Sequence, residues 1–230
     1  MDFSLQLSVE FDTPFNVGSG ASGDTWANKT MVKDRNGLPL IPGSSLKGRL
    51  RQQCEQIANA LNLEPRPCSA PNAETMCQPN RRLEREAVRA QLCPVCRVFG
   101  SPWYAGPVEF SDLRVVEPAF LHERDAYAHA TVRYGVGISR HRRVAEDQLL
   151  YTVEVFQPGS ILTLTGEVRG FQLSADDVKL LVAGLDTLFT LGGHKTRGMG
   201  WCRLHMQATE IKAGASQPLD LDALRRRWEA

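Results

Sequence analysis

Four of the six cysteines gather in one proline-rich part of the chain, where their spacing suits a metal ion. Eight, fifteen and two residues separate Cys68, Cys77, Cys93 and Cys96 in turn. The knuckle at residues 93–96 lets two thiolates reach one tetrahedral Zn²⁺. We predict a structural zinc site, because four protein ligands leave no position for a reacting water. The alternatives are loose thiols at Cys68 and Cys77, or a redox pair at 93–96, which usually needs a thioredoxin-like setting that this sequence lacks.

A glycine-rich segment, GGHKTRGMG at residues 192–200, could hold a phosphodiester backbone. Glycines let the main chain approach a phosphate closely, and basic side chains neutralise it. The segment follows a predicted helix and lacks the ending of a nucleotide P-loop, so ATP is disfavoured as its ligand. A flexible turn is the alternative. Its candidate RNA-binding residues are Gly192, Gly193, His194, Lys195, Arg197 and Gly198.

Two further groups are basic. The first opens a predicted helix, whose free N–H groups and dipole favour an anion; it consists of Ser44, Ser45, Lys47, Arg49 and Arg51. The second lies at residues 133–143, which contain no acid and offer Tyr134 for stacking on a base; it consists of Arg133, Arg140, Arg142 and Arg143. For each group, an ordinary solvated charged surface is the alternative interpretation.

Acidic candidates for catalysis are few. Asp24 and Asp34 lie in or beside a glycine-rich stretch at 16–29, near the expected anion-binding surface. Turn and capping roles are the ordinary function of such aspartates. The sequence shows no triad spacing, no metalloprotease helix and no dinucleotide fingerprint.

Composition limits the functions that these groups can serve. The 230 residues suffice for one large domain or two small ones, and a 23% charged fraction is ordinary for a globular protein. A net charge of +1 excludes nucleic-acid coating through overall basicity, so any such binding uses local patches. Only six of the 27 basic residues are lysine, which reflects either phosphate recognition by arginine or a GC-rich genome. We find no signal peptide or membrane span, so we expect a cytoplasmic protein with reduced cysteines.

The elements that must position these residues follow from hydrophobic periodicity. Residues 3–11 alternate apolar and polar, as a half-buried strand requires, whereas 16–29 favours a loop. Ser44 or Ser45 is the predicted cap of a helix, and Ser174 caps a second one. We predict a hairpin between strands 149–156 and 161–168. Further predicted strands are 108–113 and 200–211, and further helices are 81–91 and 219–228. The order indicates an α+β fold, with two helices on one face of an antiparallel sheet.

Three motifs together resemble a known family. They are LPLIPGSSLKGRLR at 38–51, CPVCRVFGS at 93–101, and the glycine segment followed by Trp201. In order and spacing over residues 3–211 they resemble the RAMP superfamily of CRISPR effector proteins, and most of all the backbone subunit of type III complexes.

The resemblance implies an RRM-like (ferredoxin-like) domain over 1–211. It carries a zinc-bearing insertion at about 62–100 and a β-hairpin thumb at about 127–157, and a tail with a short helix follows at 212–230. Such subunits line up along a guide RNA with neighbouring copies or paralogous subunits and hold target RNA in antiviral defence. By similarity, the helix start and the glycine segment contact the guide backbone. Binding of this kind depends weakly on sequence and strongly on salt.

Many family members also cut the target at regular intervals, using an aspartate after the first strand and a divalent metal. Asn28 stands where that aspartate is commonly found, and Asp24 lies four residues earlier. An amide is a poor Mg²⁺ ligand and cannot act as a base. Either Asp24 is catalytic with Mg²⁺ or Mn²⁺ through a shifted loop, or the subunit binds without cutting.

Two other functions stay open. A guide-processing endoribonuclease would need a histidine base, for which His129 or His141 is available. A zinc-stabilised RNA-binding module outside CRISPR systems is the second.

Overall fold

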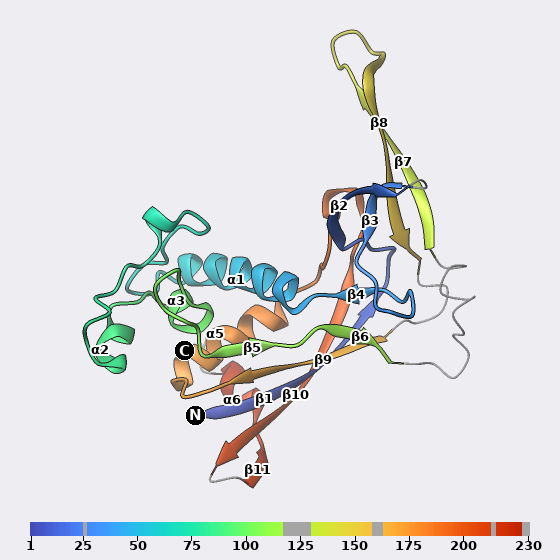
Figure 1. Cartoon of the computed structure of the whole chain (residues 1–230). Coiled ribbons are helices and arrows are strands. Elements are labelled where there is room, and N and C mark those ends of the chain that lie inside the picture. The colour runs from blue at the N-terminus through green and yellow to red at the C-terminus, as the bar shows by residue number, and fades with distance from the viewer. Residues whose placement is uncertain (25–26, 117–129, 158–162, 213–214, 227–230) are drawn as a thin grey trace.

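A computed structural model describes residues 1–24, 27–116, 130–157, 163–212 and 215–226 of the chain (Figure 1). It is an α+β protein with two sheets, as the sequence predicts. The larger sheet has seven strands, all of them paired antiparallel. Its order is β11 (Ala215–Pro218), β10 (Cys202–Lys212), β1 (Asp2–Phe11), β9 (Thr163–Gly170), β6 (Leu113–Val115) and β4 (Leu40–Ile41), with β5 (Val108–Phe110) also paired to β9.

The predicted first strand is confirmed as β1, and its alternation sets the core. Phe3, Leu5, Leu7, Val9 and Phe11 are buried, as period-two alternation requires of a strand with one face covered. Each such side chain contributes about 1.5–3 kcal/mol when fully buried.

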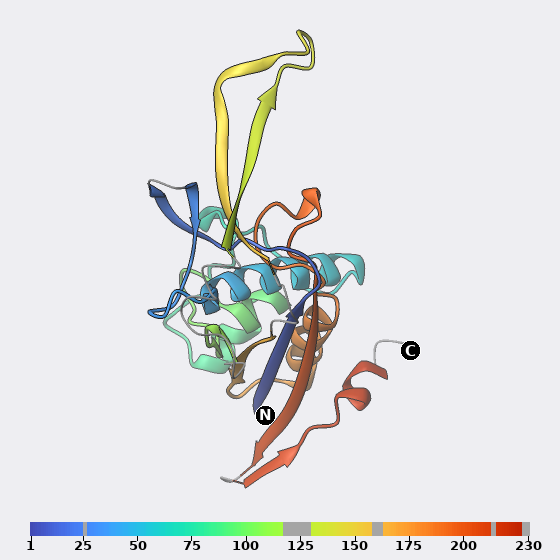
Figure 2. The same ribbon diagram turned by 90° about the vertical axis from the view of Figure 1, so that its right-hand side faces the viewer.

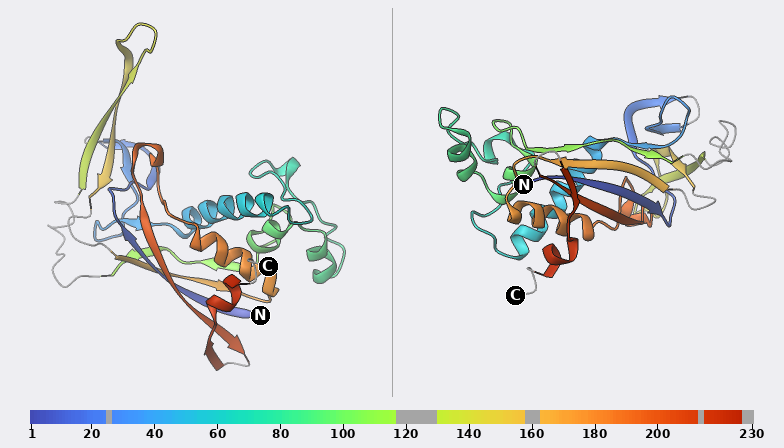
Figure 3. Two further views of the ribbon diagram at one scale, coloured as in Figure 1. Left: turned by 180° about the vertical axis from the view of Figure 1, so that it is seen from behind. Right: turned by 90° about the horizontal axis from the view of Figure 1, so that it is seen from below.

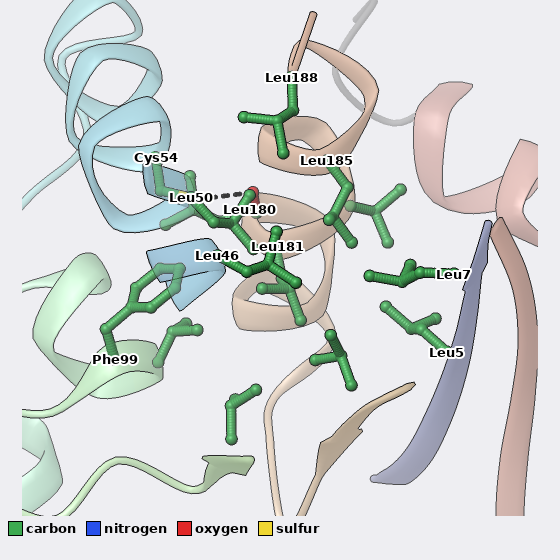
Figure 4. Packing of buried hydrophobic residues seen from close by; sticks show 14 of the residues in the cluster. Leu5, Leu7, Leu46, Leu50, Cys54, Phe99, Leu180, Leu181, Leu185 and Leu188 are labelled. Atoms are coloured by element: carbon green, nitrogen blue, oxygen red, sulfur yellow. Dashed lines mark hydrogen bonds between the residues drawn. The ribbon is translucent and has the colours of Figure 1, made fainter. Parts of the chain in front are cut away.

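Helices α1 (Gly43–Ala60) and α5 (Ala175–Asp186) cover this face. Figure 4 shows Leu46 and Leu50 of α1 meeting leucines of α5, with Leu5 and Leu7 of β1 extending toward α5 from its other side. The thiol of Cys54 donates to the carbonyl of Leu180 at 3.4 Å, which ties the two helices together.

The two helix starts follow different rules. Ser174 caps α5 as predicted, and its Oγ accepts from the Asp177 amide at 3.2 Å. The predicted serine cap of α1 is wrong, because the helix begins earlier, after Pro42, with no side-chain cap. Instead Oδ1 of Asp112 accepts from the Gly43 amide at 2.9 Å, so the first turn is satisfied by a distant loop. The helix ends at Ala60, and Leu61, which follows it, is 46% exposed.

A second sheet of four strands corrects two predictions. Residues 16–29 are not a loop, since they form β2 (Gly18–Asp24) and most of β3 (Ala27–Met31). Strand β9 does not pair with residues 149–156 but lies between β1 and β6 in the other sheet. Residues 149–156 belong to β8 (Ala145–Phe156), which pairs antiparallel with β7 (Ala130–Ile138). Alternation identifies a strand but not its partner, which here is set by distant segments.

The β7–β8 hairpin projects far from the body of the molecule (Figures 1 and 2). Its base is anchored, because Val153, Val155 and Phe156 are buried. Its outer half exposes apolar side chains, including Ile138 at 62% and Leu150 at 66%. The hairpin therefore has a core only at its foot.

The cysteine-bearing segment lies at the opposite end of the molecule from the hairpin (Figure 3). It contains η1 (Ala73–Thr75), α2 (Arg85–Ala90) and α3 (Pro94–Phe99). Buried Asp177 of α5 pairs with Arg89 and, at 3.0 Å, with Arg97, which fixes the segment to the core. A short α6 (Leu221–Arg226) packs on α5, where Arg225 pairs with Asp186 at 2.7 Å. No helix among the described residues is long and apolar enough to cross a membrane.

Candidate metal centre and nucleic-acid interface

The structure brings the four predicted metal ligands together. The Sγ atoms of Cys68, Cys77, Cys93 and Cys96 all lie within 4.8 Å of one another. The Cys68–Cys96 and Cys68–Cys93 pairs are 3.3 and 3.7 Å apart, and none of the four is in a disulfide. Metal–sulfur bonds of about 2.3 Å give a tetrahedron with edges of about 3.8 Å. The cluster therefore fits a metal such as zinc.

Local helix chemistry positions two of these ligands. Cys93 caps α3, its Sγ accepts from the Cys96 amide at 3.4 Å, and Pro94 begins the helix. The Cys77 Sγ accepts from the Cys93 amide at 3.4 Å. A hydrogen bond with the Cys96 thiol lowers the pKa of Cys93 to about 4, and the same hydrogen bond, followed by burial, raises the pKa of Cys96. Once one thiol is ionised, ionisation of its neighbour is thus opposed, and a divalent cation removes that conflict.

Two of the five polar and basic residues at the start of α1, Ser45 and Arg49, lie beside the glycine segment. A cleft of about 360 Å³, here called the glycine cleft, lies between α1 and residues 191–193. It is lined by Val17, Gly18, Ile41, Ser45, Gly48, Arg49, Leu191, Gly192 and Gly193. Ser44 lies beside it on the first turn of α1 and is exposed.

Gly192 shows why glycine is needed here. Its φ is +94°, and a Cβ atom would lie 2.4 Å from the carbonyl oxygen of Asn16. The same oxygen accepts from the Gly193 amide at 2.7 Å. Any larger residue at 192 would push the segment away from Asn16, whose carbonyl oxygen holds it.

The five residues at the start of α1 divide between two faces. Arg49 lines the glycine cleft and docks on Thr190, donating to its carbonyl oxygen at 3.3 Å. Lys47 and Arg51 line a different cleft of about 350 Å³, beside the loop that follows α3. Burial, together with nearby Arg51, lowers the pKa of Lys47. Residues four apart share a face, and residues two apart do not.

A third cleft lies at the foot of the hairpin and is here called the hairpin cleft. Its volume is about 170 Å³, and its lining contains three basic residues and no acid. The lining consists of Arg133, Tyr134, Gly135, Tyr151, Val153, His194, Arg197 and Met199. The Arg197 guanidinium lies 5.6 Å from the Tyr151 ring centre and donates to its hydroxyl, and Lys29 Nζ lies 5.8 Å from the same ring.

The glycine segment contributes residues to both the glycine cleft and the hairpin cleft. His194 and Gly198 adopt left-handed conformations on either side of η2 (Lys195–Arg197). Burial lowers the pKa of His194, and the nearby Arg197 and Lys29 lower it further. Burial and then Arg49 lower the pKa of Lys195. The segment thus carries cations that repel one another, an arrangement that an anion would relieve.

The remaining arginines lie elsewhere. Arg140, Arg142 and Arg143 lie between β7 and β8 at the hairpin tip, are exposed and line neither the glycine cleft nor the hairpin cleft. Arg142 pairs with Glu146 at 2.5 Å, and His141 is exposed beside it.

The two positions considered for catalysis lie close in the second sheet. Asp24 ends β2 opposite Ala27, and its side chain is outside the described residues, as is His129. Asn28 makes two hydrogen bonds with Thr152 of β8, each at 2.8 Å. The backbone amide of Asn28 donates to Thr152 Oγ1, and the side-chain Oδ1 of Asn28 accepts from the backbone amide of Thr152. Asn28 therefore joins β3 to the hairpin. Asp34 has the predicted turn role, accepting from the amides of Asn36 and Leu38.

Sequence reasoning missed the polar residues under the interface. Asn16 is buried and donates to the Glu154 carbonyl at 2.6 Å, while its own carbonyl holds the glycine segment. Glu154 is only 1% exposed, pairs with Lys33 and accepts from the Met31 amide at 3.0 Å. A glutamate inside the apolar run VEVF was the available signal, because buried acids need fixed partners.

Comparison with protein families gives a match over most of the chain. The family model of the RAMP superfamily matches residues 8–203, a span that includes both clefts, the hairpin and the four clustered cysteines. No curated protein matches the chain.

Proposed function

The chain belongs to the RAMP superfamily, and on this premise we propose that it is a guide-RNA-binding backbone subunit of a type III CRISPR complex. In this role it holds target RNA against the guide beside neighbouring copies or paralogous subunits, in antiviral defence in the cytoplasm. The observation that carries the proposal is the pairing of the glycine cleft with the acid-free hairpin cleft. The glycine cleft has room for an RNA backbone, and the hairpin cleft carries the basic side chains that would neutralise it.

In this proposal each part of the fold has a role. The larger sheet with α1 and α5 is an RRM-like palm within 1–211, the hairpin at about 127–157 is the thumb, and residues 62–100 form the zinc-bearing insertion. The tail at 212–230 adds β11 and α6 to the palm.

The guide lies along the glycine cleft and reaches the hairpin cleft. Main-chain atoms at Gly192, Gly193 and Gly198 approach the phosphates, and the nearby cations neutralise them. The side chains that we assign to this path are Ser44, Ser45, Arg49, Arg133, His194, Lys195 and Arg197, with Arg140, Arg142 and Arg143 at the tip. Lys47 and Arg51 line the neighbouring cleft beside α3 and lie off this path. Contacts of this kind recognise phosphate and sugar, so guides of any sequence would bind.

We propose that the subunit holds its target without cutting it. Support comes from Asn28, an amide at the position where the family commonly has an aspartate, whose oxygen is engaged by Thr152. The alternative is cleavage through Asp24 with Mg²⁺ or Mn²⁺.

A denaturing-gel assay of the reconstituted guide complex with complementary RNA separates these outcomes. Wild type, Asp24→Ala and Asn28→Asp are compared in Mg²⁺ and in EDTA. We expect tight binding and an intact target in the wild type. Asn28→Asp keeps an oxygen that accepts from Thr152 and adds the missing carboxylate, so regular cutting by this variant alone would support the holding role. Regular wild-type products that vanish in EDTA and in Asp24→Ala would instead establish a nuclease.

Two other results would overturn the proposal. A chain that stays monomeric on long single-stranded RNA would indicate a zinc-stabilised RNA-binding module outside CRISPR systems. Cutting of precursor guide RNA that is lost in His141→Ala would indicate a guide-processing endoribonuclease.

A further inference from the structure

Arg51 is the basic residue of α1 that lies against the cysteine cluster rather than in the glycine cleft. Its three donor nitrogens each have a protein acceptor. Nε donates to Glu55 at 2.9 Å, one terminal nitrogen donates to the Gly100 carbonyl at 2.7 Å, and the other donates to Cys96 Sγ at 3.3 Å. The side chain is only 14% exposed. The guanidinium is therefore fixed in one orientation.

Two of these hydrogen bonds connect α1 to α3 and to the residue that follows it, and the third, to Glu55, lies within α1. Cys96 lies within α3, and Gly100 follows the last residue of that helix. Gly100 has φ of +85°, and a Cβ there would lie 2.6 Å from the Gly106 amide nitrogen, so the chain is confined as it leaves α3. One planar side chain thus holds a ligand sulfur and the end of the helix that carries it.

The charge of the cluster gives this contact a chemical role. A divalent ion with four thiolates carries a net double negative charge in a partly buried place. Two of the N–H···S bonds in the cluster come from the backbone amides of Cys93 and Cys96 themselves. Arg51 supplies a charged donor from outside the segment. Charge-assisted bonds are about twice as strong as neutral ones.

We propose that Arg51 is a positioning residue of the metal centre, which orients the Cys96 thiolate, offsets the charge of a Cys₄ zinc site and fastens that site to α1. Donors of this kind next to a ligand change metal affinity by about 10- to 100-fold. The proposal rests on the cysteine cluster and not on RNA binding, so it can fail while the proposed function stands.

The test compares Arg51→Met and Arg51→Lys with two matched controls. Arg49→Lys changes an arginine on the same helix that docks on a carbonyl and lies outside the cysteine cluster. Glu55→Gln removes the ion pair of Arg51 and leaves its donors to Cys96 and Gly100. Zinc affinity is measured by competition with a chromophoric chelator, and the cobalt-substituted proteins give the sulfur-to-metal charge-transfer bands.

We expect Arg51→Met to bind zinc about 10- to 100-fold more weakly. Its charge-transfer bands should move to longer wavelength, because a thiolate without a hydrogen bond gives up its electrons more easily. The zinc affinity and band positions of Arg51→Lys should lie between those of Arg51→Met and wild type. Both control variants should have the zinc affinity and band positions of wild type. The spectral shift separates this role from a structural one, which would leave the bands in place. Wild-type affinity and bands in both Arg51 variants, or a wild-type protein without bound metal, would overturn the proposal.

Discussion

Single residues around Tyr151 determine the charge of the hairpin cleft. Arg197 is exposed and contacts the tyrosine ring, while Lys29 approaches the same ring. Cations that share one neutral partner keep most of their charge available for phosphate.

Arg197→Ala should therefore weaken RNA binding and lower the slope of log affinity against log salt by about 0.7, the value for one single-strand phosphate. Fluorescence anisotropy at a series of salt concentrations measures both quantities. Arg66→Ala is the matched control, because Arg66 is 78% exposed in the cysteine-bearing segment and its substitution removes the same charge. An unchanged slope in Arg197→Ala would mean that this side chain meets no phosphate.

His194 should make RNA binding depend on pH. Burial first, and then Arg197 and Lys29, hold its pKa below the ordinary value of about 6.5, so the free protein carries a neutral imidazole at pH 7. A phosphate nearby favours the protonated form, so binding takes up a proton and affinity rises as the pH falls through the pKa of the bound form. Each unit by which RNA raises this pKa is worth up to about 10-fold. Titrations at pH 7.5 and 5.5 should show the rise in wild type and lose most of it in His194→Gln.

Among the elements, the glycine segment depends on backbone shape rather than charge. Gly192 and Gly198 both have positive φ, which strains any residue with a side chain. They differ in their surroundings, because a Cβ atom at Gly192 would lie 2.4 Å from a backbone oxygen, whereas the space beside Gly198 is open. The pair therefore separates backbone strain from steric clash.

Gly198→Ala should cost about 1 kcal/mol of unfolding free energy, from strain alone. Gly192→Ala should cost more and also weaken RNA binding, since the clash with Asn16 displaces the segment. Denaturant unfolding and anisotropy measure the two effects. Equal unfolding free energies in the two variants would show that the segment moves freely.

Patterns within one element could be predicted, and contacts between distant elements could not. The alternation of β1 and the capping serine of α5 depend on neighbours in sequence, so they appear in the sequence directly. The partner of β8 does not, because residues 131–138 and 161–168 are both strand-forming and only tertiary packing chooses between them. The same limit applies to the site. Spacing grouped the four cysteines and placed Lys47 with Arg51, but it could not tell that Arg51 meets Cys96.

Across the whole molecule, the cysteine cluster and the hairpin stand at opposite ends, with α1 between them (Figure 1). Four cysteines from three short stretches meet at the first end, in a segment with few regular elements. A metal there replaces part of the hydrophobic core that such a segment lacks.

Removing the metal should lower the melting temperature. Chelation, or Cys93→Ser, leaves thiols that oppose one another's ionisation and frees the segment from α1. Elemental analysis with thermal melting, with and without chelator, provides the measurement. Cys202→Ala is the control for metal content, because Cys202 is buried outside the cluster. A zinc-free wild type whose melting is indifferent to chelator would exclude the metal.

The projecting hairpin has a consequence for motion. Two strands without a second layer cannot bury their own apolar side chains, and Tyr134, Ile138 and Leu150 remain more than half exposed. Local opening of such a ribbon costs little, so amide hydrogens in its outer half exchange with solvent much sooner than those at Val153–Phe156. A partner that covers this hairpin gains affinity from the apolar contact. Part of that gain is offset by the conformational entropy that the strands lose when they become rigid. Binding of a partner should therefore slow amide hydrogen exchange in the outer half of the hairpin more than elsewhere in the molecule.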